Sequence, residues 1–312
     1  MTTPEPRVTN IVLNWNGCED SADCLASLQR VTYANRRVMV VDNGSTDNSV
    51  AFLRERYPDI DYVENDRNLG FAEGNNVGIR RALSAGADWV MLLNNDTTVE
   101  PEFLSTLVSS AAADETIGII GPQINREDAP DRVWFAGGRI CLWSGWSWHV
   151  GNHRRDRGQY RGLVDEDYQT GACMMISRRV LETVGELDAG YVSYFEDGDL
   201  CLRAKQAGFR VVCCRDARIH HKVSGSTRVP GQAGGGLTPH KAYRKILSGS
   251  RFYRRYAGRA RYYTTIAAFN FVYAAVTVLV ETLRGKFDVV GAICRGFADL
   301  FRGRDRDVTE TE

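Results

Sequence analysis

Carboxylates and amides gather at a few points of this sequence, where they suit the binding of a phosphorylated ligand through a divalent metal. Asp96 closes the polar run Asn94-Asn95-Asp96, and Asp42 follows another apolar segment. Hard oxygen ligands suit Mg²⁺ or Mn²⁺, and a diphosphate needs its charge neutralised. Asp96 is therefore the best candidate for a metal ligand, and Asp42 is placed to accept hydrogen bonds from a nucleobase or ribose.

A second acidic cluster, Glu196, Asp197 and Asp199, lies at the start of a predicted helix. Acids favour that end of a helix, so ordinary capping is the alternative interpretation. Three acids in four positions exceed what capping needs, and one carboxylate there could take a proton from an attacking hydroxyl. Farther along, His221 is a candidate metal ligand or phosphate contact. Its neighbour His220 is the rival, and a purely structural role stays open.

A glycine-rich run, residues 68–76, opens another predicted helix. Backbone of this kind can approach a phosphate or a sugar closely. The run matches neither the dinucleotide fingerprint nor a Walker loop, so the sequence does not support an NAD or ATP site.

The elements that must position these residues alternate in type over the first hundred residues. Apolar runs predict strands at 8–13, 38–41, 61–64 and 89–93, with helices at 21–29, from Ser45 or Thr46 to 56, and at 72–84. This order predicts a parallel sheet with helices on both faces. Ligands of such sheets bind beyond the carboxyl ends of the strands, although Asn, Asp and Gly there can also simply make turns. The polar residues that follow predicted strands are Asn14, Asn16, Asp42 and Asn94-Asn95-Asp96.

The middle of the chain, residues 118–168, gives a less regular pattern. It holds four of the six tryptophans, whose faces could stack on sugars or fill a core. Regular elements return as strands at 172–177 and 209–213, with helices at 179–184 and from 196. Residues 224–236 are rich in Gly and Ser and predict a mobile loop. The four tryptophans are Trp134, Trp143, Trp146 and Trp148.

The last part of the chain has a different character. Of 39 Lys and Arg residues and 39 Asp and Glu residues, residues 240–312 hold 14 basic and 7 acidic ones. Eight basic residues fall in 241–261, and the 19 residues 262–280 carry no charge, close to the 20 or so that cross a bilayer. With an amphipathic helix at 289–301, this pattern indicates a segment lying on an anionic membrane surface. A true span, a helical cap or an oligomer contact are the alternatives.

Composition narrows the class of protein. With 312 residues, 43% of them hydrophobic, the chain is neither disordered nor fibrous, and its zero net charge argues against a nucleic-acid binder. Eight cysteines form no CxxC pair, which indicates a reducing compartment. The first ten residues lack the apolar run of a signal peptide. We expect a cytoplasmic protein at the inner face of the membrane.

Six motifs, in this order over residues 7–228, resemble family 2 glycosyltransferases with the GT-A fold, especially the rhamnosyltransferase-like branch. They are NWNG, VDNGSTDNS, NLGFAEGNN, LLNNDT, FEDGDLCLR and HHKVSGST. The resemblance implies an α/β, Rossmann-like fold with a mixed, mainly parallel sheet flanked by helices. The catalytic domain would span 1–239, with a nucleotide-binding half to about 120 and an acceptor half beyond it, and a helical membrane-associating tail would span 240–312.

The same resemblance implies an inverting, metal-dependent transfer from a nucleotide-diphosphate sugar. Asn94 stands where the family has the first Asp of its DxD motif, which leaves the metal one carboxylate fewer. The loop after Ser224 would close over the donor. The implied roles are donor binding by Asn14, Asn16, Gly17, Asp42, Asn43, Asn68, Gly70, Asn94 and Asn95, Mg²⁺ or Mn²⁺ binding by Asp96 and His221, and proton abstraction by Asp197 beside Glu196, with Asp199 ordering the site.

Rhamnose from a dTDP donor is the leading hypothesis for the sugar, and UDP-linked sugars or GDP-mannose fit the same residues. The expected acceptor is a cell-surface or lipid-linked glycan; the oligomeric state stays open. The sequence leaves two alternative functions. A nucleotidyltransferase would need a basic glycine loop near the first strand, which NWNG lacks. A catalytically inactive carbohydrate-binding or scaffold protein would lack the base or the metal carboxylate, yet Asp96 and Asp197 are both present.

Overall fold

The computed structural model describes residues 5–191, 193–223 and 237–303. The loop predicted at 224–236 lies outside the described residues, as do the first four residues. All eight cysteines are free thiols.

A ten-stranded mixed sheet forms the centre of the molecule, with the strand order β10-β12-β6-β11-β4-β1-β2-β3 and with β5 and β7 pairing beside β12 and β6. The predicted parallel sheet is confirmed, because β1 pairs in parallel with both β2 and β4, and β2 with β3. The following strand, β11, is antiparallel to both of its neighbours, β4 and β6. The strands are β1 (Val8–Asn14), β2 (Arg36–Asp42), β3 (Asp61–Glu64), β4 (Trp89–Asn94), β5 (Thr97–Val99), β6 (Ile117–Arg126), β7 (Val133–Phe135), β10 (Leu163–Asp165), β11 (Cys173–Ser177) and β12 (Arg210–His221).

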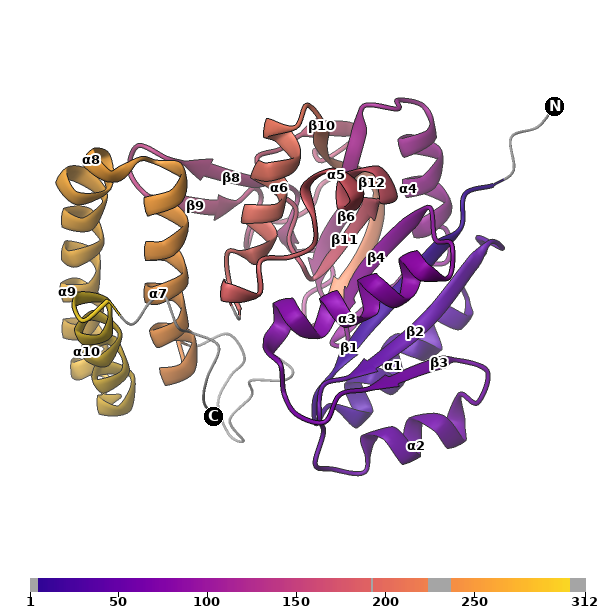
Figure 1. The fold of residues 1–312 in the computed structure, drawn as a ribbon, viewed down its shortest axis with the longest axis horizontal. Helices are drawn as coiled ribbons and strands as arrows, with labels where there is room; N and C mark the ends of the chain where they lie inside the picture. Colours follow the sequence, from indigo (N-terminus) through magenta and orange to yellow (C-terminus); the bar gives the residue numbers. More distant parts are fainter. Residues whose placement is uncertain (1–4, 192, 224–236, 304–312) are drawn as a thin grey trace.

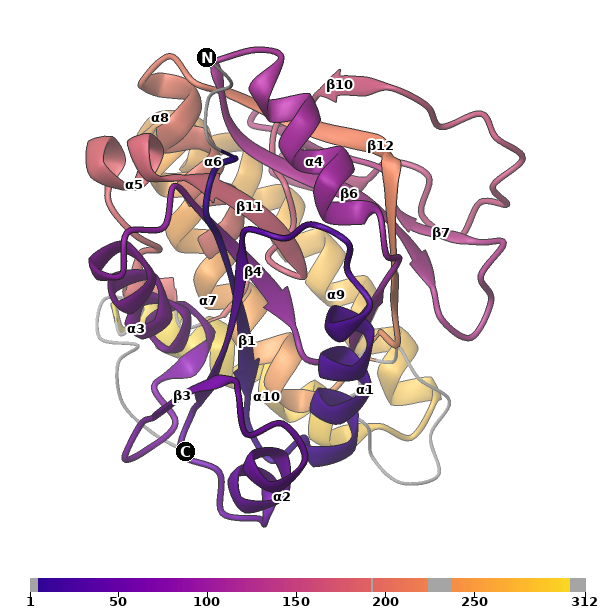
Figure 2. The ribbon, with the colours of Figure 1, turned by 90° about the vertical axis from the view of Figure 1, so that its right-hand side faces the viewer.

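Helices cover both faces of this sheet. Figure 2 shows α1 and α4 on one side of the strands and α3, α5 and α6 on the other. Apolar side chains of both layers meet the buried strands in one continuous core, which explains why the central strands are apolar along nearly their whole length. The helices are α1 (Cys18–Gln29), α2 (Ser49–Arg56), α3 (Gly70–Ser84), α4 (Phe103–Ala112), α5 (Arg178–Val184) and α6 (Glu196–Gln206).

The register of the parallel strands brings the predicted polar residues to one edge. Asn14 is the register partner of Asp42, and Leu13 is the partner of Asn94. The carboxyl ends of β1, β2 and β4 therefore lie side by side, as ligand binding at that edge requires.

Several predicted boundaries shift, and two of these shifts have a clear physical reason. Helix α1, for example, begins at Cys18 and not at residue 21. Helix α2 begins at Ser49 after Asn48, and neither Ser45 nor Thr46 caps it. The hydroxyl of Ser45 instead donates to Asp42. Strand β12 runs on to His221, well past the predicted end at 213, because β6 and β5 pair with its second half.

The irregular middle section is a set of short strands that reach beyond the sheet. β8 (Gly138–Cys141) and β9 (Trp146–His149) form a separate antiparallel hairpin. Trp143, Trp146 and Trp148 are exposed on it, whereas Trp134 packs against the main core. The hairpin extends toward the C-terminal helices (Figure 1).

The tail forms a helical layer at one end of the molecule, far from β2 and β3 (Figure 1). It contains α7 (Pro239–Tyr256), a helix over Arg259–Leu283 whose last part is α9 (Ala267–Leu283), and α10 (Phe287–Phe301). A π-helical turn, Tyr262–Ile266, interrupts the second helix. Among the described residues, Arg259–Leu283 is the one helix long and apolar enough to cross a membrane, and little of it is buried.

Two apolar clusters hold the tail in place. One joins Phe252, Tyr253 and Ile266 of the tail to Tyr191 of the catalytic part, and the other packs α7 against α10. The rings of Phe269 and Tyr273 also contact Trp146 of the hairpin edge-on. These contacts hold the tail against the rest of the chain, which we call the catalytic part after the predicted catalytic domain. The domain boundary at residue 239 stays a prediction.

Candidate active site

A cleft of about 2260 Å³ lies between the carboxyl ends of the central strands, the β8–β9 hairpin and the tail helices. Most of the predicted site residues line it, and five do not. Those in its wall are Asn43, Asn68, Gly70, Asn94, Asn95, Asp96, Glu196, Asp197 and His221. Those set back from it are Asn14, Asn16, Gly17, Asp42 and Asp199.

Asp96 and His221 meet at the floor of the cleft. β12 pairs with β5 so that His221 faces Thr97, which brings the imidazole Nε2 to 2.9 Å from Asp96 Oδ1. Both side chains are buried, and the imidazole Nδ1 has no hydrogen-bond partner among the described atoms. His220, the rival, points elsewhere and lies 3.7 Å from Glu100. The structure thus brings His221, and not His220, to Asp96.

This pair suits a divalent cation. Two neighbouring ligands of an octahedral ion with bonds of about 2.1 Å are separated by roughly 3 Å, close to the 2.9 Å between Asp96 and His221. No group of three or more His, Cys, Asp or Glu side chains suited to a metal occurs in the described part of the chain. An ion held here would therefore take its other ligands from phosphate oxygens and water, as Mg²⁺ commonly does.

Asp197 lies in the first turn of α6, which follows two residues with a strained backbone. Tyr194 and Phe195 have φ angles of 67° and 71°, a left-handed conformation that costs about 1–3 kcal/mol per residue and concentrates at functional sites. The Asp197 carboxylate accepts hydrogen bonds from the backbone N–H of Gly198 at 2.7 Å and of Gly171 at 3.0 Å. Asp197 is therefore held in a fixed direction while part of it stays open to the cleft.

The environment of Asp197 favours a proton. Burial raises the pKa of Asp197, while the N–H groups of Gly171 and Gly198 oppose this shift. Glu196 is buried beside it, and burial together with the charge of Asp197 raises the pKa of Glu196. Glu196 Oε2 has no hydrogen-bond partner among the described residues. A carboxylate with a raised proton affinity is the type of group that acts as a general base.

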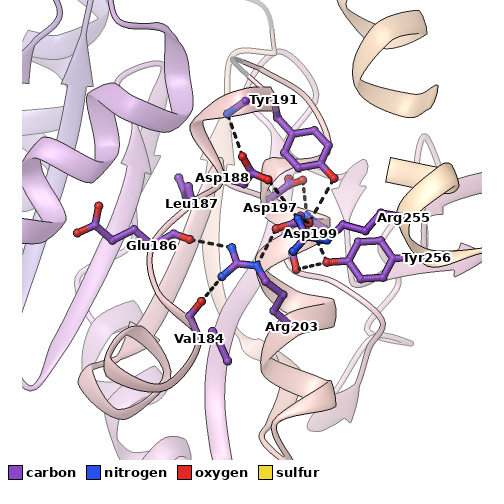
Figure 3. A network of polar contacts seen from close by, with 12 residues as sticks. Val184, Glu186, Leu187, Asp188, Tyr191, Asp197, Asp199, Arg203, Arg255 and Tyr256 are labelled. Carbon is purple, nitrogen blue, oxygen red and sulfur yellow. Dashed lines mark hydrogen bonds and ion pairs between the residues drawn. The ribbon is translucent and has the colours of Figure 1, made fainter. Parts of the chain in front are cut away.

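Asp199 is fully buried and links α6 to the tail (Figure 3). Its Oδ1 accepts a hydrogen bond from the Tyr256 hydroxyl at 2.7 Å and another from Tyr191 at 3.2 Å. Its Oδ2 accepts from Arg203 at 2.7 Å, and Arg255 lies 3.1 Å from Oδ1. These contacts run to α6 and the tail, and Asp199 does not line the cleft. That Asp199 orders the site stays a prediction.

At the carboxyl ends of β1 and β2, the side chains of Asn14 and Asp42 are hydrogen-bonded to each other. Asn14 Nδ2 donates to Asp42 Oδ1 at 2.7 Å, and Ser21 donates to Asn14 Oδ1 at 2.7 Å. Asp42 also accepts from the backbone N–H and the hydroxyl of Ser45. Asn16 adopts a φ of 50° and accepts from the N–H of Thr46. Three hydrogen bonds leave the Asp42 carboxylate little free capacity, so its contact with a nucleoside stays a prediction.

Asn43 fixes the glycine-rich run beside the cleft. Its amide donates to Asn68 Oδ1 at 2.8 Å and to the Gly70 carbonyl at 3.1 Å. Gly70 has a φ of 80°, a conformation that favours glycine. Close by, Asn95 donates to Ser21 at 3.0 Å, and a Cβ on Gly17 would lie 2.5 Å from the Asn95 amide. These contacts shape the wall of the cleft from within.

Sequence reasoning missed the wall that the tail contributes. The cleft is lined by four residues of α7: His240, Lys241, Arg244 and Lys245. The sequence pattern predicts instead that this basic run lies on a membrane surface. Arg255, from the same run, contacts Asp188 and Asp199 of the catalytic part. The signal was available in the three- and four-residue spacing of the cations, which places them on one face of a helix.

Comparison with known proteins identifies the family of this chain. Residues 11–185 match the model of the family described as glycosyl transferase family 2. The chain is 29% identical over 224 residues to the low-salt glycan biosynthesis hexosyltransferase Agl10 of Haloferax volcanii, covering 70% of this chain and 68% of that protein. It is 28% identical over 228 residues to the N-acetylglucosaminyl-diphospho-decaprenol L-rhamnosyltransferase of Mycobacterium tuberculosis, covering 66% of this chain and 73% of that protein.

Solved structures share the fold. The mannosyltransferase PcManGT from Pyrobaculum calidifontis, in complex with GDP-Man and Mn²⁺, superimposes with a TM-score of 0.56 at 17% identity, over 95% of this chain and 87% of that one. GalNAc-T7 with UDP, GalNAc and Mn²⁺ gives a TM-score of 0.58 at 15% identity, over 81% and 55%. Since the family model spans more than half of the sequence, the chain belongs to glycosyl transferase family 2 and is a glycosyltransferase with the GT-A fold.

Proposed function

We propose that this glycosyltransferase is inverting and depends on a divalent metal, and that it transfers a sugar from a nucleotide-diphosphate donor. One observation carries the proposal: the Asp96–His221 pair and the Asp197 carboxylate line the same cleft. We call the Asp96–His221 pair the metal-binding corner. In an in-line displacement at an anomeric carbon, a metal there neutralises the leaving diphosphate, and a partly exposed carboxylate takes the proton of the acceptor hydroxyl.

Asp96 and His221 would hold the metal, which supplies charge neutralisation for the departing diphosphate. Asp197 takes the proton of the attacking acceptor hydroxyl. Its two backbone hydrogen bonds keep the carboxylate aimed at the cleft, and its raised pKa strengthens it as a base. Glu196 is a second carboxyl group, buried beside Asp197. A single base such as Asp197 suits inversion.

The sugar that we favour is rhamnose from dTDP-rhamnose, with a lipid-linked or cell-surface glycan as the acceptor. Support comes from the mycobacterial relative, whose name states an L-rhamnosyl transfer to a diphospho-decaprenol glycolipid. Among nearby folds, GDP-Man and UDP occupy related enzymes, so UDP- and GDP-linked sugars are the competing donors.

A lipid-linked acceptor requires access to a membrane, and α9 offers a suitable face. Phe271, Val272, Val276 and Leu279 are each more than half exposed on it. A contiguous exposed apolar face of this size is typical of an interaction site, and apolar helices next to basic residues associate with anionic lipid. We therefore place the enzyme at the inner face of the cell membrane.

A thermal-shift panel tests the central proposal, because a ligand that binds the folded state raises its melting temperature. dTDP, UDP and GDP are compared with and without Mn²⁺ in the parent protein and in Asp96→Ala. We expect one nucleotide to raise the melting temperature only with Mn²⁺ and only in the parent. If no nucleotide shifts the parent under any metal, the donor site is not functional and the proposal is wrong.

A further inference from the structure

One face of α7 is directed at the catalytic part of the molecule. Lys241, Arg244, Lys245 and Ser248 have the spacing i, i+3, i+4 and i+7, so they share that face. The hydrogen bonds of Ser248 show which segment this face contacts. Its hydroxyl donates to the carbonyls of Tyr191 at 3.0 Å and of Ser193 at 2.9 Å. The face thus lies over the segment that leads into Glu196 and Asp197.

The cations of α7 are neutralised unequally along the helix. Toward its carboxyl end, Arg251 and Arg255 each lie 3.1 Å from Asp188. Toward its amino end, Arg244 and Lys245 form no ion pair with any described residue. Arg244 is 8% exposed, and its Nε lacks a hydrogen-bond partner within the described chain.

Lys245 follows Arg244 on the same face, and its side chain is exposed. Its Nζ lies 5.5 Å from the centre of the Tyr194 ring, a cation–π contact that replaces only part of its hydration. Partial loss of hydration lowers the pKa of Lys245, and no carboxylate opposes the shift. Arg244 is the buried cation of the two, and a buried cation without a counter-charge costs free energy that is offset when an anion binds.

Both cations line the same cleft as Asp96 and His221. Burial, and after it the charge of Lys245, lowers the pKa of His149 to about 4. The rings of His149 and His221 in turn lie 4.7 Å and 4.6 Å from that of Trp134.

We propose that Arg244 and Lys245 form a diphosphate-binding wall, through which the tail takes part in the reaction opposite Asp96 and His221. Arginine suits a phosphate because its planar fork can donate two parallel hydrogen bonds, and lysine adds a compact charge. The inference rests on the proposed function, which supplies two diphosphates: that of the nucleotide donor and that of a lipid-linked acceptor. Both present the same chemistry to the wall.

Calorimetric titration of the full chain with Mn²⁺ separates the two sources. One arm compares dTDP with dTMP, UDP with UMP and GDP with GMP. The other compares phosphatidylcholine vesicles containing a polyprenyl diphosphate with vesicles containing the matching monophosphate. The variants are Arg244→Gln/Lys245→Met, Lys245→Met alone in case the double variant does not fold, and Lys245→Arg as the charge-conserving form. Arg259→Gln, an exposed cation of the same tail, is the matched control.

We expect the double variant to lose on the order of tenfold of the preference for diphosphate over monophosphate in one arm, with Lys245→Met losing part of it. Lys245→Arg and Arg259→Gln should keep the preference, and the arm that responds identifies the source. Variants that bind both diphosphates like the parent overturn the wall and leave the proposed function standing. A parent that binds neither diphosphate contradicts the proposed function and the wall together.

Discussion

The hydroxyl of Tyr256 donates a 2.7 Å hydrogen bond to the buried carboxylate of Asp199. Tyr256 ends α7 of the tail, whereas Asp199 lies on α6, two residues after Asp197. The helix that carries the proposed base is therefore held by the tail as well as by the sheet, and the tail belongs to the structure of the active site.

Tyr256→Phe removes this link without removing the ring. A hydrogen bond to a buried charged group contributes about 1.5–3 kcal/mol, so we expect the free energy of unfolding to fall by that order. The turnover number should fall as well, because α6 loses a contact that fixes its first turn. Urea denaturation and steady-state kinetics measure the two effects. Tyr263→Phe, which changes an exposed tyrosine of the tail, should alter neither, and unchanged stability in Tyr256→Phe would contradict the role of the bond.

The two adjacent histidines allow a matched test of the metal site. His221→Ala should abolish Mn²⁺ binding, because it removes one of the two proposed protein ligands and leaves Asp96 alone. His220→Ala should bind Mn²⁺ like the parent, since His220 faces Glu100. Titration calorimetry with MnCl₂ and a nucleoside diphosphate measures both affinities. Equal loss in the two variants would show that the effect is one of folding and not of coordination.

Asp197→Asn keeps the shape of the side chain and removes its basicity. General-base catalysis typically contributes about 10²–10⁴-fold, so we expect the turnover number to fall by that factor while the Kd of the nucleotide donor changes little. Kinetic assays and calorimetry measure the two quantities. Asp59→Asn, at an exposed turn, serves as the control. A variant with the turnover of the parent would exclude Asp197 as the base.

Glu166 gives a prediction for stability against pH. Burial raises its pKa from 4.5 to about 7, although Arg139 and Arg215 lower it. The folded state therefore keeps a proton that the unfolded chain releases near pH 4.5. Stability from this group is present below pH 4.5 and is lost as the pH rises through 7, by about 3 kcal/mol.

Chemical denaturation of the parent and of Glu166→Gln between pH 4.5 and 8 checks this sign. The parent should lose stability relative to Glu166→Gln over that interval, because glutamine does not titrate. Glu182→Gln changes a carboxylate whose side chain is 58% exposed, and it should follow the parent. A parent that gains stability relative to Glu166→Gln would mean that the two arginines outweigh burial.

Replacing the exposed face of α9 tests membrane association. Phe271 and Leu279 are 62% and 60% exposed, and burying such side chains in lipid contributes about 1.5–3 kcal/mol each. Phe271→Glu/Leu279→Glu should therefore weaken binding to vesicles of anionic lipid by roughly a hundredfold or more. Vesicle sedimentation measures it. Leu163→Glu, on the distant strand β10, should bind like the parent; equal binding by the α9 variant would contradict the assignment.

Much of the catalytic part could be predicted, because the sequence patterns that indicate its strands and helices are local. Apolar runs of strand length between helical segments indicated β1 to β4, and the polar residues that follow β1, β2 and β4 had to meet at one edge of a parallel sheet. The acidic first turn of α6 was predicted for the same reason. These features depend on residues that are close together in the sequence.

The remaining features depend on contacts between distant residues. Arg215, Asp216 and Arg218 interrupt the apolar pattern of β12, so its second half is a strand only because β5 and β6 pair with it. Asp199 meets Tyr256 across 57 positions, and no local pattern marks that pair. The charged face of α7 could be predicted as a helix face, but its orientation follows from tertiary packing.

The opposite sides of the cleft are anchored in unequal ways. His221 ends a 12-residue strand paired with β5 and β6, so displacing it means breaking a hydrogen-bonded ladder. Arg244 and Lys245 lie on a helix held by side chains alone, and such contacts open at a lower free-energy cost. In amide hydrogen exchange, β12 should protect its amides for much longer than the first turns of α7. Acceptors of different size would then be accommodated on the helical side, with the strand as the fixed reference.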